Sequence, residues 1–173
     1  MSTSFLLISD TVWFTAIGLR HIVSSSHVSI YFVLICTDIC KDKILNEENE
    51  KFDKILIDAP CSGLGVIRRN PDTKWRVLEK DLKKYKERQI NMLENLAKYV
   101  KKLGTIVYAV CSAEPEETDE VATSFLKSHP EFKIEKIENE LFRNTRFFGK
   151  NYLKTSPNID DMDGFFCICF KKL

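Results

Sequence analysis

The sequence lacks several patterns that are typical of metal-binding and secreted proteins. Its six cysteines form no C-x-x-C pair and no C-x-x-H pair, so the usual zinc spacings are absent. No basic segment followed by a small-residue cleavage site opens the chain, and 173 residues are many for a small disulfide scaffold. We therefore expect reduced thiols, no bound metal and a cytoplasmic location.

A charge imbalance and long apolar runs are also missing. The chain has 26 basic and 25 acidic residues, and a net charge of +1 neither requires nor excludes a nucleic-acid partner. Polar residues interrupt every apolar run of residues 1–40, and none reaches the roughly 18 residues of a membrane span. With 44% hydrophobic residues, the sequence predicts one soluble globular domain without membrane contact.

The start of the chain differs in composition from the rest. Residues 1–40 hold only three charged side chains, and two of these are Asp10 and Asp38. Asp10 ends the apolar run FLLIS and precedes Asp38 by 28 residues, which is about the length of one strand-helix-strand unit. We interpret residues 1–37 as an atypical segment, a remnant of such a unit, and residues 38–173 as the core of the domain.

The rest of the sequence alternates between strand and helix patterns. Apolar runs rich in β-branched residues predict strands over residues 28–36, 54–57 and 105–110. Helical spacing predicts a helix over 80–103, which Gly104 ends, and a second helix from Pro115 to about residue 128. Two further strands are expected over residues 132–137 and from Gly164 onward.

This order of elements predicts an α/β fold with a mainly parallel sheet. The strands that end at Asp58 and Val110 should lie parallel, with both carboxyl ends on one edge. Cys61 and Cys111 each follow one of these strands, so both thiols should face the crevice where open α/β sheets bind ligands. The cysteine pattern alone is as compatible with two unreactive thiols near a sheet edge. A dithiol redox pair is a further alternative, but it explains neither Asp58 nor the loop RRNPDTKWR.

Three segments carry a resemblance to a known family. They are DAPCSGLGVIRRNPDTKWR (58–76), VYAVCSAEPEE (107–117) and DGFFCICFKK (163–172). They resemble the RsmB/Nop/Sun family of RNA 5-methylcytosine methyltransferases, most closely its bacterial 16S ribosomal RNA branch, in the right order over roughly residues 36–172. The resemblance implies a class I, Rossmann-like domain that depends on S-adenosylmethionine, with an antiparallel C-terminal strand.

The chemistry of that family explains why two cysteines are needed. C5 of cytosine becomes nucleophilic only after a thiolate adds to C6, and the enzyme must afterwards be eliminated. The resemblance implies that Cys111 is the nucleophile and that Cys61 assists release of the methylated RNA. It also implies that Asp58 lies at the cofactor and the base, where it could hold N3 and N4 of cytosine.

Formation of the Cys111 thiolate needs a local cause. A free thiol has a pKa of ~8.5, and the N-terminus of a helix can lower it. The helix predicted from Pro115 would supply that field near Cys111, but three carboxylates oppose it: Glu114, Glu116 and Glu117.

The resemblance is weaker at the cofactor site. Asp38 matches the acid that contacts the adenine end of the cofactor, Asp58 contributes from the next strand, and Asp10 would hold the ribose. The family's glycine-rich loop has no counterpart, because Gly18 is the only glycine before Gly63. We therefore expect a domain that is truncated at its N-terminus and lacks the strand that separates the run before Asp10 from the strand ending at Asp58.

A cluster of cations and one aromatic follows Cys61 and suits contacts to phosphate and stacking on bases. Its members are Arg68, Arg69, Lys74, Trp75 and Arg76. The alternative is a solvated loop whose Trp75 packs on the next helix. The function expected is methylation of cytosine C5 in RNA, with 16S ribosomal RNA as substrate; the alternatives are a transfer RNA substrate and a noncatalytic RNA-binding or scaffold fragment.

Overall fold

The computed structural model describes residues 4–9, 15–24, 27–36, 52–136 and 151–173, the first three ranges as backbone. The strands are β1 Ser4–Ser9, β2 Thr15–Ser24, β3 His27–Cys36, β4 Phe52–Asp58, β5 Val100–Val110, β6 Phe132–Ile134, β7 Tyr152–Thr155 and β8 Phe165–Lys172. The helices are α1 Thr73–Arg76, α2 Glu79–Ala97, α3 Asp119–Ser128 and α4 Pro157–Asp160, with single 3-10 turns η1 Leu64–Val66 and η2 Pro115–Glu117.

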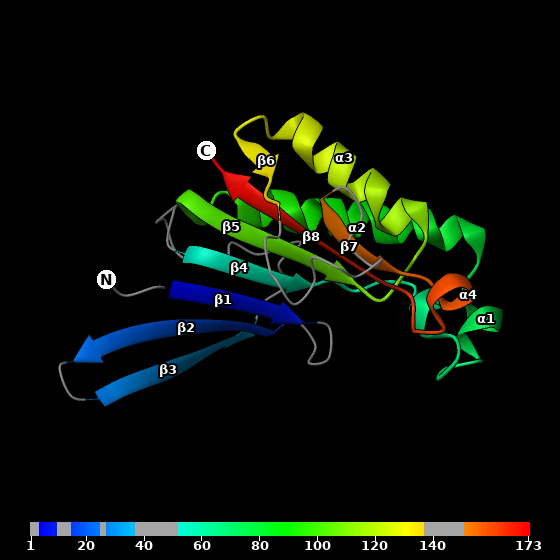
Figure 1. Cartoon of the computed structure of the whole chain (residues 1–173), viewed down its shortest axis with the longest axis horizontal. Coiled ribbons are helices and arrows are strands. Elements are labelled where there is room, and N and C mark those ends of the chain that lie inside the picture. The colour runs from blue at the N-terminus through cyan, green and yellow to red at the C-terminus, as the bar shows by residue number, and fades with distance from the viewer. Residues whose placement is uncertain (1–3, 10–14, 25–26, 37–51, 137–150) are drawn as a thin grey trace.

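The strands form one open sheet with a parallel centre (Figure 1). Its order is β3-β2-β1-β4-β5-β8-β6, and β7 also pairs with β8. The three central strands β1, β4 and β5 are parallel, whereas β2 and β3 on one side and β8 with its neighbours on the other are antiparallel. The α/β class and the antiparallel C-terminal strand are confirmed, and the parallel pairing is confined to the centre of the sheet.

Two helices cover one face of this sheet. Figure 1 shows α2 and α3 side by side along it, and both bury an apolar stripe. Leu93 and Leu96 of α2 and Phe125 of α3 are fully buried against the alternating inward residues of the strands, such as Ile55 and Ile57 of β4. Each such side chain contributes about 1.5–3 kcal/mol by leaving water. This core fixes the positions at which β4 and β5 end.

The end of helix α2 differs from the prediction. The helix stops at Ala97, and β5 begins at Val100, which is fully buried and pairs with Phe52 of β4. Leu103 has a left-handed φ of 61°, which the interior of a right-handed helix does not allow. The spacing of Val100 and Leu103 continued the helical pattern by coincidence, so the prediction of a helix to residue 103 was wrong.

The start of the chain also differs from the expected arrangement. Residues 15–24 form strand β2, whereas a strand-helix-strand unit between Asp10 and Asp38 would place the helix there. Strand β1 pairs directly with β4, at the place where we expected a missing strand. Asp10 and Asp38 themselves lie outside the described residues, and the division at residue 37 stays a prediction.

The remaining elements follow the sequence more closely. Strands β3 and β6 confirm the expected runs, although Ile137 lies outside the described residues. The helix expected from Pro115 is split, because Thr118 has non-helical backbone angles between η2 and α3. Among the residues that the structure describes, no helix is long and apolar enough to cross a membrane, and no group of three or more potential metal ligands gathers.

Candidate active site

The two central strands deliver two cysteines to one point. Asp58 at the end of β4 pairs with Ala109 of β5, and the Ala59 N–H donates to the Ala109 carbonyl at 2.9 Å. The segments that follow these two parallel strands leave the sheet side by side. They bring the Sγ atoms of Cys61 and Cys111 to 3.0 Å from each other. The structure therefore brings together the two thiols that the sequence placed at one sheet edge.

The two thiols have opposite pKa shifts. The pKa of Cys61 is raised, first because its thiol is hydrogen-bonded to Cys111 and then because it is buried. The pKa of Cys111 is lowered, mainly by the hydrogen bond from Cys61. These opposite directions favour Cys61 as the donor and Cys111 as the acceptor of the contact, which is the polarity that a nucleophilic Cys111 would need.

The source of this activation corrects the sequence argument. We expected the helix from Pro115 to lower the pKa of Cys111, but α3 begins only at Asp119, after the single turn η2. The hydrogen bond from Cys61 has that effect instead. Of the three carboxylates that we expected to oppose it, Glu117 raises the pKa of Cys111, and so does Asp58, which we had not expected in this role.

Asp58 lies at the carboxyl edge of the parallel strands, half-buried between the ends of β1 and β5. Its place in the register is opposite Ser9 on one side and Ala109 on the other. A carboxylate there can accept hydrogen bonds from the hydroxyl or amino groups of a ligand bound over the sheet edge, as in other open α/β sheets. It is the one residue of the predicted cofactor set that the structure describes.

The loop after Cys61 folds back onto Cys111. The Gly65 N–H donates to the Cys111 carbonyl at 3.1 Å, and the Gly164 N–H donates to the Gly65 carbonyl at 2.7 Å. A Cβ atom on Gly65 would overlap the Gly164 carbonyl oxygen and lie 2.7 Å from the Cys111 oxygen. Glycine is therefore required at position 65 for the three motifs of the sequence to meet.

Sequence reasoning missed a buried polar network beneath the thiols. Glu117 is fully buried, and its carboxylate accepts hydrogen bonds from the Ser62 N–H (2.8 Å), the Ser62 hydroxyl (2.5 Å) and the Gln89 side chain (3.2 Å). One signal was available: Glu117, Val121 and Phe125 follow each other at helical spacing, and both apolar members point into the core. A carboxylate on that stripe is expected to have buried partners.

The predicted RNA-contacting residues form two groups. Arg68 and Arg69 pair with Asp161 (3.0 Å) and Asp163 (2.5 Å), so they connect this loop to the segment before β8. Lys74, Trp75 and Arg76 are exposed on α1, and Trp75 is 78% exposed, which shows that the alternative of Trp75 packing on the next helix is wrong.

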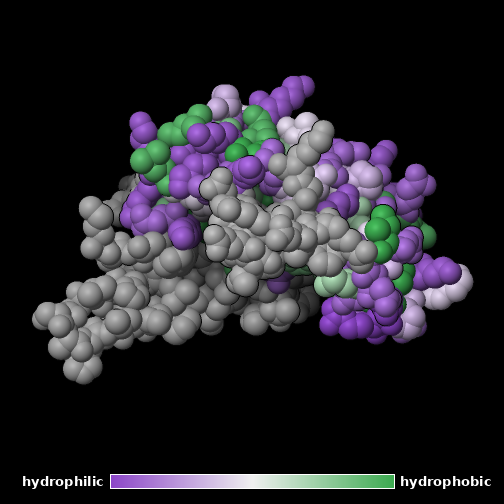
Figure 2. All heavy atoms as spheres, viewed as in Figure 1, coloured by the Kyte–Doolittle hydropathy of each residue, from purple (hydrophilic) through white to green (hydrophobic). Residues whose placement is uncertain are grey.

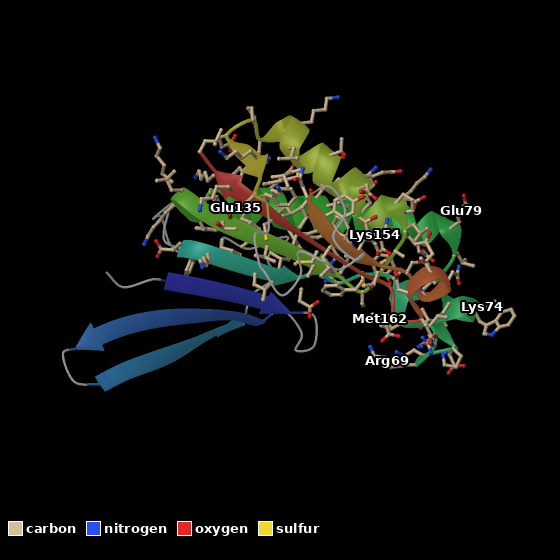
Figure 3. All side chains as sticks on the ribbon, in the orientation of Figure 1. Arg69, Lys74, Glu79, Glu135, Lys154 and Met162 are labelled. Atoms are coloured by element: carbon tan, nitrogen blue, oxygen red, sulfur yellow. The ribbon has the colours of Figure 1, made fainter. Side chains whose placement is uncertain are left out.

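Both groups lie at the same end of the molecule. Figure 3 shows Arg69, Lys74 and Met162 together near α1 and α4. Figure 2 shows a concentration of hydrophilic side chains over this end. The strands β1, β4 and β5 point toward this end in Figure 1. It therefore lies beyond the carboxyl ends of the strands, which Cys61 and Cys111 follow.

Comparison with known proteins finds the same family that the three sequence motifs resemble. The family described as 16S rRNA methyltransferase RsmB/F matches residues 25–171. The chain belongs to this family. It is 42% identical over 127 residues to the probable ribosomal RNA small subunit methyltransferase B of Bacillus subtilis (strain 168). That match covers 72% of the chain and 28% of the relative, so the chain corresponds to about a quarter of the longer protein.

Solved structures support the class I methyltransferase fold of the RsmB/F chain. The crystal structure of PH0851 superimposes with a TM-score of 0.69 at 31% identity, over 79% of this chain and 30% of that one. A methyltransferase homolog protein from Pyrococcus horikoshii gives a TM-score of 0.56 at 27% identity, over 72% of this chain and 40% of that one.

Proposed function

We propose that this chain carries the catalytic residues for methylation of cytosine C5 in 16S ribosomal RNA. The observation that carries the proposal is the pair of thiols 3.0 Å apart at the carboxyl edge of the sheet, with Asp58 at the end of the same strand. The substrate is supported by membership of the RsmB/F family and by the name of the Bacillus subtilis relative. The transfer RNA alternative has the same chemistry.

We assign the two thiols different steps, and their opposite pKa shifts support this assignment. The Cys111 thiolate adds to C6 of cytosine, and the electron pair of the C5–C6 double bond becomes available at C5. Asp58 holds N3 and N4 of the base during this addition. S-adenosylmethionine supplies the methyl group. Once C5 has lost its proton, the C5–C6 double bond reforms and sulfur leaves C6 as a thiolate, which the Cys61 S–H stabilises.

The cofactor would be held by acidic residues at the strand ends. Asp58 is placed to accept hydrogen bonds from hydroxyl or amino groups of such a ligand, while Asp38 and Asp10 stay predictions for its adenine and ribose ends. The sequence supplies no glycine-rich loop before Gly63 that could approach the methionine part. A cytoplasmic location likewise stays a prediction.

RNA would bind at the end of the molecule where α1 lies. Trp75 presents an exposed ring on which a base can stack, and Lys74 and Arg76 are exposed cations beside it. Arg68 and Arg69 are engaged with Asp161 and Asp163, so their contribution is to shape this surface as well as to carry charge.

The substrate is tested by mass spectrometry of digested RNAs from cells without the gene that encodes this chain. Loss of a 5-methylcytidine from 16S ribosomal RNA, restored by the wild-type gene but not by a Cys111→Ala version, is the expected result. Loss from transfer RNA alone would support the alternative substrate. Unchanged 5-methylcytidine in both RNAs would contradict the proposal and support a noncatalytic fragment.

A further inference from the structure

We propose that Glu117 is a positioning residue that holds the Cys61 thiol against Cys111. What Cys61 does once it is held there rests on the proposed function, but the placement itself does not. Glu117 is separated from Cys61 by 56 positions in the sequence and comes from η2, the turn that precedes α3. It acts through its hydrogen bonds and contacts no reacting atom.

The network fixes the backbone on both sides of Cys61. On the C-terminal side, the Glu117 carboxylate accepts from the N–H and the hydroxyl of Ser62, at 2.8 and 2.5 Å. On the N-terminal side, the Gln89 side-chain amide donates to the Pro60 carbonyl at 3.0 Å and to Glu117 Oε1 at 3.2 Å. Cys61 is therefore held between Pro60 and Ser62, and the side chains of Gln89 and Glu117, which are hydrogen-bonded to each other, bind these two neighbours.

Glu117 is also hydrogen-bonded through its backbone to β5, the strand that precedes Cys111. Tyr108 in β5 donates its hydroxyl to the Glu117 carbonyl at 2.8 Å, and Cys111 follows Tyr108 by three positions. Tyr108 is fully buried, and burial raises its pKa well above the ordinary value, so the hydroxyl keeps the proton that it donates. Glu117 thus links the two segments whose thiols must meet.

Burial makes these hydrogen bonds decisive for geometry. Glu117 and Gln89 are fully buried, and Ser62 is 6% exposed, so water does not compete for the hydrogen bonds among these three residues. Removal of the carboxylate leaves the Ser62 N–H and the Gln89 amide in the core without this acceptor. The loop then moves to satisfy its donors elsewhere, and the Cys61 thiol moves with it.

The charge of Glu117 has a separate effect, which distinguishes it from a neutral spacer. It raises the pKa of Cys61 and also that of Cys111. A glutamine at 117 can keep an acceptor for the Ser62 N–H and a donor for the Ser62 hydroxyl while it removes the charge. Glu117→Gln should therefore retain the placement of Cys61 but shift the alkylation of Cys111 to lower pH.

The test measures how fast the two thiols form a disulfide in the 173-residue chain with diamide as oxidant. One thiolate adds to the diazene, and the other then attacks the sulfur of this adduct, which forms the disulfide and releases a hydrazine that carries the two electrons and two protons. The rate of this second step depends on how closely the two sulfur atoms are held. Glu117→Ala should slow disulfide formation about tenfold or more, as expected for a misplacement near 1 Å. Glu117→Gln keeps the placement and loses only the charge, so it should form the disulfide at least as fast as the wild type.

Two further variants make the result specific. Glu116→Ala removes a half-buried carboxylate from the same turn and should leave the rate unchanged. If Glu117→Ala does not fold by circular dichroism, Gln89→Leu takes its place, because it removes both bonds donated by Gln89 and should also slow the reaction. Wild-type rates in a folded Glu117→Ala or Gln89→Leu variant, or an equal loss in Glu116→Ala, would overturn the proposal.

A second readout separates this inference from the proposed function. If Cys61 releases the methylated RNA, Glu117→Ala should accumulate the covalent RNA adduct as Cys61→Ala does. An adduct with Cys61→Ala but none with a folded Glu117→Ala overturns the positioning role. Failure of Cys61→Ala to accumulate adduct overturns the role of Cys61 in release, while the diamide rates still decide whether Glu117 places it.

Discussion

At the scale of single residues, the proposed chemistry depends on the asymmetry of two neighbouring thiols. A hydrogen bond shared by Cys61 and Cys111 lowers the pKa of the acceptor and raises that of the donor. The sequence predicted that both thiols face one crevice, because both follow strands that end at the same edge. It did not predict which thiol activates the other, because this depends on a 3.0 Å contact between residues 50 positions apart.

This asymmetry predicts the pH dependence of Cys111 alkylation by iodoacetamide. A lowered pKa means a larger thiolate fraction at a given pH, so the midpoint should lie below that of a free cysteine. Cys61→Ala removes the donor and should move the midpoint up, whereas Cys61→Ser keeps a hydroxyl donor and should move it less. Peptide mapping separates Cys111 from Cys169 and Cys167, whose pKa values burial raises, for Cys167 to about 12.

A midpoint equal to that of free cysteine in the wild type would show that the contact with Cys61 does not activate Cys111. The same conclusion would follow if Cys61→Ala left the midpoint unchanged.

At the scale of elements, the strands were easier to predict than the ends of the elements and the short segments that connect them. β4 and β8 are marked by dense runs of β-branched or aromatic residues with turn residues at their ends. The end of α2 was missed because Val100 and Leu103 continue the helical spacing while pairing with β4 decides their structure. Strand β7 and helix α4 have four residues each, too few for a periodic pattern.

The close approach of Gly65 to Gly164 and Cys111 leads to a prediction about stability. Gly65→Ala would place a methyl group against the carbonyls of Gly164 and Cys111, so the loop must shift, at a cost of about 1–3 kcal/mol in the free energy of unfolding. Gly63→Ala is the matched control, because its Cβ meets only ordinary contacts at 3.9 Å and suffers only from its φ of 72°, about 1 kcal/mol. Urea denaturation measures both.

Only Gly65→Ala should also slow disulfide formation between Cys61 and Cys111, because only its methyl group displaces the Cys111 carbonyl. Equal losses of stability in the two variants, with unchanged thiol proximity in Gly65→Ala, would show that the close approach of the two glycines does not position the site.

At the scale of the whole molecule, the sheet places the thiol pair and the exposed side chains of α1 toward the same end. The family could be identified from sequence because three motifs that are distant along the chain are recognisable by residue type. The structure of residues 15–24 could not, since an apolar segment with few charges shows neither the polar face of a surface helix nor a strict alternation of strand residues. The antiparallel pairing of β2 with β1 and β3 decides it.

The exposed residues of α1 predict how RNA binding divides between stacking on Trp75 and attraction to cations. Trp75→Ala should weaken binding of a single-stranded RNA by about 1–3 kcal/mol, because it removes the exposed ring. Ile159→Ala on α4 removes a comparably exposed apolar side chain, 74% exposed, and should have little effect. Fluorescence anisotropy at several salt concentrations measures both, and an equal loss in the two variants would contradict a stacking role for Trp75.

The most direct test of the central claim, that Cys111 attacks cytosine and Cys61 assists release, is covalent trapping. RNA that carries 5-fluorocytosine blocks removal of the group at C5, so the enzyme should remain attached through Cys111. Denaturing electrophoresis with S-adenosylmethionine present should show an RNA–protein adduct for the wild type and for Cys61→Ala, and none for Cys111→Ala. An adduct that persists in Cys111→Ala, or that is lost only in Cys61→Ala, would contradict the account.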